Sequence, residues 1–112
     1  MYILHIFFVR LNITLPPLRE ILKSASGEDL PISGGYGDSI DDPIIIDKDC
    51  KDWSSVMYRV LGLINALLHR EYQLVQASLI EHNGRQIDQI KLAVVGEKGC
   101  RVNYYFDVTD HM

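Results

Sequence analysis

The stretch LVQASLIEHNGRQIDQIKLAVV, residues 74–95, decides the fold of this chain. It consists of two runs rich in Leu, Ile and Val on either side of Asn83-Gly84. Because both residues of this dipeptide tolerate positive φ, it favours the tight two-residue turn that joins paired antiparallel strands. The stretch therefore predicts a β-hairpin.

A two-residue loop fixes the register of the hairpin, with Ile80 opposite Ile87 and Ala77 opposite Ile90. Counting by twos from the second pair gives one apolar face: Val75, Ala77, Leu79, Ile90, Leu92 and Val94. The other face is mainly polar: Gln76, Ser78, Gln89 and Lys91. One apolar and one polar face is typical of an antiparallel sheet that is covered by helices on one side only.

The segments on either side of the hairpin extend this pattern. CRVNYYFDV, residues 100–108, alternates apolar and polar residues and predicts the third strand of a meander. Upstream, Asp52 is a good N-cap for a helix over residues 53–69. Its apolar residues recur at spacings of three and four: Trp53, Val56, Met57, Val60, Leu61, Leu63, Ile64, Leu67 and Leu68. We expect this stripe to form core against the meander.

The first half of the chain predicts three further elements. Residues 2–9 form an apolar run expected of a buried strand, and residues 43–47 predict a short one. LPPLREILKSASG, residues 15–27, predicts a helix with Pro16 or Pro17 in its first turn and Gly27 at its C-terminus. Its inner stripe is expected to be Leu18, Ile21, Leu22 and Ala25. The resulting order β-α-β-α-β-β-β predicts one α+β domain over residues 1–112, with two helices and a mainly antiparallel sheet.

Composition narrows the range of partners. The 112 residues carry a formal net charge of −4, which disfavours general binding to a nucleic-acid backbone and permits a cationic protein partner. The N-terminal apolar run is too short to span a bilayer and lacks the features of a secretion signal. We therefore expect a cytoplasmic protein without a membrane partner. In that compartment Cys50 and Cys100 are expected to be reduced thiols.

The stretch SGGYGDS, residues 33–39, raises the question of ligand binding. It lacks the Lys of a phosphate-binding loop, and the aspartates that follow would repel phosphate. A divalent cation is an alternative, with oxygen ligands from Asp38, Ser39, Asp41 and Asp42. Their spacing does not match a calcium-binding EF-hand loop, so a solvated glycine turn is the preferred interpretation. We expect neither a metal nor a cofactor.

Catalytic motifs are also missing from the sequence. No pattern of nucleophile, base and orienting group of a known type occurs around the four histidines. The chain is therefore predicted not to be an enzyme. A small nuclease-like enzyme that uses His69 or His82 remains an alternative.

The acidic residues are concentrated in one segment. Residues 26–52 contain eight acids and two bases, a net charge of −6, whereas the rest of the chain has a net charge of +2. We predict that residues 33–42 form an acidic recognition loop, with Tyr36 as anchor. Its carboxylates, from Asp38, Asp41 and Asp42, are expected to face a cationic site on a partner. The alternative is a solvated surface without a partner.

SGGYGDSIDDPIII, residues 33–46, followed by an amphipathic helix and a meander ending in YYFDV, resembles small bacterial immunity proteins. These are encoded beside polymorphic or contact-dependent growth inhibition toxins. The resemblance implies a cytoplasmic protein that binds and neutralises one cognate toxin domain, often a nuclease with a cationic active site. A homo-oligomeric structural or adaptor protein, pairing through an exposed strand edge or the polar sheet face, is the main alternative.

Overall fold

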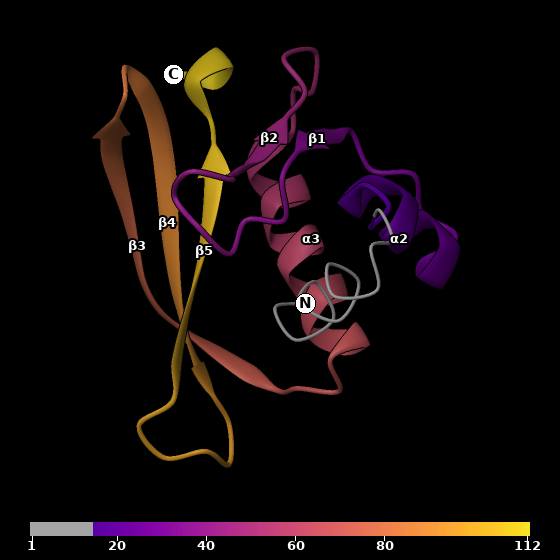
Figure 1. Ribbon diagram of the computed structural model, residues 1–112, viewed down its shortest axis with the longest axis vertical. Coiled ribbons are helices and arrows are strands. Elements are labelled where there is room, and N and C mark those ends of the chain that lie inside the picture. Colours follow the sequence, from indigo (N-terminus) through magenta and orange to yellow (C-terminus); the bar gives the residue numbers. More distant parts are fainter. Residues whose placement is uncertain (1–14) are drawn as a thin grey trace.

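The computed structural model describes residues 15–112 and has an α+β architecture, with two helices on one side of a five-stranded mixed sheet (Figure 1). In chain order the elements are α2 (Leu18–Ser26), β1 (Ile32–Gly34), β2 (Ile44–Ile46), α3 (Trp53–Leu67), β3 (Tyr72–His82), β4 (Arg85–Val94), β5 (Arg101–Asp107) and a 3-10 turn, η1 (Thr109–His111). The strand predicted at residues 2–9 lies outside the described residues. No helix within 15–112 has the length and apolar character needed to cross a membrane.

The sheet has the strand order β1-β2-β5-β4-β3. Every neighbouring pair is antiparallel except β2 and β5, which run parallel over two residues. Strands β3, β4 and β5 form the predicted meander. The sheet is therefore mainly antiparallel, as expected, and the parallel pair is a feature that the sequence did not indicate.

The hairpin turn between β3 and β4 confirms the prediction from Asn83-Gly84. Both residues have positive φ, 52° and 76°, and His82 pairs with Arg85 across the turn. The predicted partners are also observed, with Ile80 opposite Ile87 and Ala77 opposite Ile90. A β-bulge between Leu74 and Gln76 then shifts the register, so that Leu74 replaces Val75 opposite Leu92.

Helix α2 ends at Gly27 as its sequence predicts, but it begins at Leu18, so that Pro17 is the N-cap and neither proline lies in the first turn. The carbonyl of Pro17 accepts the N–H groups of Glu20 and Ile21, and Gly27 ends the helix in the left-handed conformation at φ 78°. Leu18 and Leu22 are buried, whereas Ala25 is exposed and was wrongly assigned to the inner stripe. The stripe is narrow because the short helix meets α3 and β1 along only one side.

Helix α3 ends two residues earlier than expected, at Leu67. Asp52 occupies the N-cap position but makes no side-chain capping hydrogen bond. His69 lies just beyond the helix with φ 51°, a left-handed conformation that is uncommon for a residue with a side chain. The interior of the predicted stripe is confirmed, because its middle residues are buried: Met57, Val60, Leu61 and Ile64.

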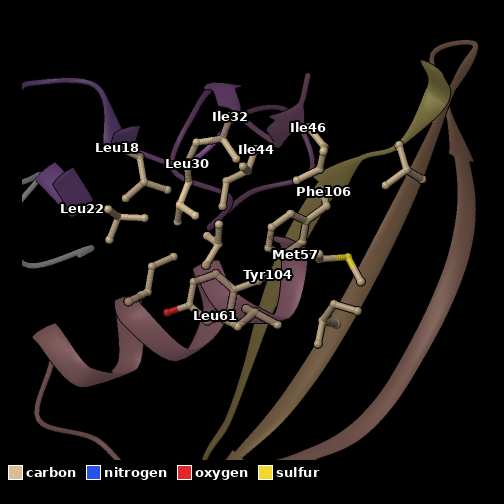
Figure 2. Close-up of a cluster of buried hydrophobic side chains, with 14 of the residues drawn as sticks. Leu18, Leu22, Leu30, Ile32, Ile44, Ile46, Met57, Leu61, Tyr104 and Phe106 are labelled. Atoms are coloured by element: carbon tan, nitrogen blue, oxygen red, sulfur yellow. The ribbon is translucent and has the colours of Figure 1, made fainter. Parts of the chain in front are cut away.

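The main hydrophobic core lies between the helices and the sheet (Figure 2). Phe106 is fully buried in this core, which also contains side chains from α2, α3, β1 and β2. The predicted apolar face of β5 is part of this core: Val102, Tyr104, Phe106 and Val108. From β4, the predicted residues Ile90 and Leu92 are completely buried.

The core does not extend over β3 as predicted. Val75 and Leu79 are 48% and 51% exposed, and Ala77 is exposed as well. Among the described residues of β3, only Tyr72 packs against the core, and it is only partly buried. The reason is geometric, because β3 is the edge strand furthest from β1 and β2 and neither helix reaches over it.

Candidate functional site: the glycine–aspartate loop

The glycine–aspartate loop, residues 33–42, comprises the end of one strand of a β-hairpin and most of the connection to the other strand. Residues Ile32–Gly34 form a short strand, β1, that the sequence did not predict, and this strand pairs antiparallel with β2. Within the loop the N–H of Gly35 donates to the Pro43 carbonyl at 2.9 Å, and the N–H of Gly37 donates to the Asp42 carbonyl at 2.9 Å. The loop is thus closed by backbone hydrogen bonds.

Glycine is favoured in this loop because other groups approach the backbone closely. A Cβ at Gly35 would overlap the Asp42 side chain. A Cβ at Gly37 would lie 2.7 Å from Ile44 Cδ1, and the residue has φ 77°, which strongly favours glycine. The glycines therefore shape the loop, as the sequence suggested.

The loop is also attached to the centre of the sheet. Strand β2 pairs with β5 only at Phe106 and Asp107. The N–H of the preceding residue, Tyr105, therefore needs an acceptor outside β2. It donates to the Gly37 carbonyl at 2.8 Å. The loop thus continues the hydrogen bonding of β2 and is held against β5.

Tyr36 is partly buried in the loop. Its ring packs against the core cluster, and its hydroxyl donates to the Pro16 carbonyl at 2.5 Å. Burial, together with the carboxylates of Asp42 and Asp38, raises the pKa of the Tyr36 hydroxyl. The structure therefore gives Tyr36 a role in joining the loop to the segment before α2, in addition to its predicted role as anchor.

The three aspartates of the loop have different environments. Asp42 folds back, and its carboxylate accepts the N–H of Tyr36 at 3.4 Å. Asp41 lies 3.0 Å from His82 Nε2 with 77% of its side chain exposed. Asp38 is exposed and forms no hydrogen bond or ion pair with the rest of the described chain. All three carboxylates remain at the surface, although Asp42 also supports the backbone.

The contact between Asp41 and His82 joins the loop to the tip of the β3–β4 hairpin. No local pattern could have predicted it, because the two residues are 41 positions apart. His82 is the last residue of β3, and His69 lies shortly before its first residue. The strand between them is about 33 Å long at the usual rise per residue. The two histidines therefore cannot act on the same bond.

Several acids of the segment 26–52 are paired with arginines on the helices. Glu28 forms a bidentate ion pair with Arg59 of α3. Asp29 lies 2.7 Å from Arg19 of α2, and Asp47 lies 3.5 Å from the same guanidinium group. Much of the negative excess in the sequence is thus neutralised locally. The three aspartates of the glycine–aspartate loop form no ion pair with a Lys or Arg of residues 15–112, and the same is true of Asp49 and Asp52.

Residues 15–112 contain no cluster of three or more His, Cys, Asp or Glu side chains suited to hold a metal ion. Cys50 and Cys100 are both free and partly exposed. No protein-family model, characterised protein or solved structure matches the chain.

Proposed function

We propose that this chain is a small acidic binding protein of the immunity class, which binds and neutralises a cognate bacterial toxin domain in the cytoplasm. The observation that carries the proposal is the set of exposed carboxylates on the glycine–aspartate loop, from Asp38, Asp41 and Asp42. A cationic site on the toxin is the complementary surface, because opposite charges speed encounter and disfavour other partners.

The construction of the loop supports a role in binding. Its backbone is held by internal hydrogen bonds and by the bond between Tyr105 and Gly37. A loop that is already ordered loses little conformational entropy when it binds, so more of the interaction energy appears as affinity. The carboxylates are thus presented at fixed positions.

The proposal is tested by surface binding of the toxin domain encoded beside this gene. We choose Asp38→Asn with Asp41→Asn, because Asp42 also supports the loop backbone. The double variant is expected to lower the association rate about 10-fold at low salt, and about 0.5 M salt is expected to remove most of the difference by screening. The matched control is Glu20→Gln with Glu97→Gln, which makes the same change in net charge at exposed positions outside the loop.

Tyr36 is expected to affect dissociation instead. Tyr36→Ala should speed dissociation by an amount equivalent to about 2 kcal/mol if the ring is a hot spot, while Tyr36→Phe keeps the ring and separates this effect from loss of the hydroxyl bonds. A wild-type protein that does not bind the toxin domain would disprove the proposed function. Equal association rates for the loop variant and its control would remove the loop from the interface.

A further inference from the structure

Two helices do not cover a sheet of five strands. Strands lie about 4.8 Å apart and a helix with its side chains is about 10 Å wide, so each helix covers roughly two strands. In this protein α2 packs on β1 and α3, and α3 shares the core with β2, β4 and β5. Strand β3 lies at the edge of the sheet, and neither α2 nor α3 lies over it (Figure 1).

Three side chains on the uncovered face of β3 are apolar. The register places Leu74, Ala77 and Leu79 beside Leu92, Ile90 and Asp88 of β4, which identifies the face of the sheet that also carries the core. We call these three residues of β3 the β3 apolar face. Leu74 and Leu79 are each 51% exposed. Apolar residues that recur on one face of an edge strand mark an interaction surface when they stay exposed, as these do within residues 15–112.

The apolar surface continues onto helix α3. Gly62 lies on the side of α3 that faces β3, since a Cβ at this position would be 3.7 Å from the Tyr72 hydroxyl. Tyr58 precedes Gly62 by one helical turn, on the same side of the helix, and is 42% exposed. An occupant of the β3 apolar face would therefore also contact an aromatic side chain.

A carboxylate without a counter-charge lies at one end of this surface. Asp88 stands between Leu79 and Phe106 on the core-bearing face of the sheet, and it is partly buried. It forms no hydrogen bond or ion pair with any described residue, and its burial raises its pKa. Glu81, on the same face by register, adds a second acid and no positive charge. By register, no Lys or Arg of β3 or β4 lies on this face of the sheet.

We propose that the β3 apolar face and Asp88 bind an amphipathic helix of a partner protein, which presents Leu-type side chains and a Lys or Arg that pairs with Asp88. The helix would lie over β3 beside α3 and complete the layer that α2 and α3 begin. A second copy of this chain is less suited, because it would bring the acids of two chains with net charge −4 together. This surface consists of residues other than the glycine–aspartate loop.

The test uses a synthetic probe and needs no toxin domain. The probe is a helical peptide of about 18 residues containing only Leu and Lys, with Leu at helical spacing. A peptide of the same pattern with Glu in place of Lys is the charge control. Binding is measured by fluorescence anisotropy, and its position is mapped by amide chemical shifts. We expect the Leu/Lys peptide to bind and to shift the amides of Leu74, Ala77 and Leu79.

Variants of the surface then identify its contacts. Leu79→Ser and Asp88→Asn should each weaken binding about 10-fold, whereas Ser78→Ala, on the opposite face, should have no effect. Glu97→Gln is the matched control for the loss of one charge. Asp88→Asn is not expected to unfold the protein, because it removes a carboxylate whose ionised form burial disfavours.

Four outcomes would overturn the proposal. They are equal binding of the Leu/Glu peptide, affinities unchanged in both surface variants, dissociation constants weaker than about 1 mM, and shifts confined to the glycine–aspartate loop. A fifth is self-association of the protein alone that Leu79→Lys abolishes in sedimentation experiments. That result would make a second copy the occupant of the β3 apolar face.

Discussion

Single side chains connect segments that are far apart in the sequence. The buried carboxylate of Asp107 accepts hydrogen bonds from Arg85 Nε at 2.8 Å and from the Thr109 hydroxyl at 2.6 Å. Burial by itself raises the pKa of Asp107, but the bonds from Arg85 and Thr109 outweigh this effect and leave the pKa below its ordinary value. The ionised form of Asp107 thus stabilises the junction of β4, β5 and η1.

Asp107→Asn is expected to lower the free energy of unfolding by about 1–3 kcal/mol at pH 7, because charged hydrogen bonds to a buried group are lost. A carboxylate whose pKa is lower in the folded protein contributes stability above its unfolded pKa of about 3.9. That contribution disappears as the pH falls through the folded pKa. Urea denaturation at pH 7 and near pH 2.5 should therefore show a large difference between variant and wild type at pH 7 and a small one in acid. Equal differences at both values would contradict the assignment.

The buried polar residue Asn65 in α3 was not predicted from the sequence. Asn65 is 1% exposed within a stripe predicted to be apolar. Its Nδ2 donates to the Leu61 carbonyl at 2.7 Å, and its Oδ1 accepts a bond from Arg70, which also donates to the Tyr104 hydroxyl. Helical spacing places Asn65 on the inner side, and its amide bonds Leu61 of the same helix and Arg70 just after it, while the link onward to Tyr104 of β5 joins a distant segment. Such networks depend on tertiary structure and have no local sequence pattern.

At the scale of elements, the features that were predicted are those set by local chemistry. The turn at Asn83-Gly84, the end of α2 at Gly27 and the buried stripe of α3 follow from backbone preference and periodicity. Val75, Ala77 and Leu79 of β3 were predicted to be covered, because alternation identifies an apolar face without showing whether a helix reaches it. Likewise, composition and glycines identified the glycine–aspartate loop, while its link to His82 depends on the meander folding beside it.

The buried stripe of α3 can be tested by matched truncations. Ile64→Ala is expected to lower the free energy of unfolding by about 2–5 kcal/mol, because Ile64 is fully buried and its removal leaves a cavity. Leu67→Ala, one turn later and 38% exposed, should cost clearly less. Denaturant midpoints of both variants give the comparison. Similar losses for the two truncations would show that the stripe is not oriented as described.

At the scale of the whole molecule, the sheet consists of two unequally connected parts. The meander pairs over long antiparallel stretches, whereas the β1–β2 hairpin joins β5 through a two-residue parallel pair and the bond from Tyr105 to Gly37. Packing of α2 and α3 against β1 and β2 supplements this junction. The loop that we propose as a binding site therefore belongs to the less extensively paired part of the sheet.

Native-state hydrogen exchange should detect this difference. Amides in the centre of β4, such as those of Ile90 and Leu92, are expected to exchange only through global unfolding. The amide of Tyr105, which donates to the loop, should exchange through a smaller opening with a lower free energy. Gly37→Ala should lower the protection of Tyr105 further and leave Ile90 affected only by the global loss of stability. Equal protection of Tyr105 and Ile90 in the wild-type protein would contradict the distinction.

The hydrogen bonds that hold the glycine–aspartate loop also bear on how such a protein can evolve. The loop is closed from one backbone group to another, and its link to β5 is the backbone bond between Tyr105 and Gly37. Substitution of Asp38 therefore changes the chemistry of the surface and leaves these backbone bonds in place, and substitution of Asp41 removes in addition only its exposed side-chain contact with His82. A lineage under selection to follow a changing partner could diversify these positions rapidly while its glycines stayed constant. Recognition can then change in steps that leave folding almost untouched.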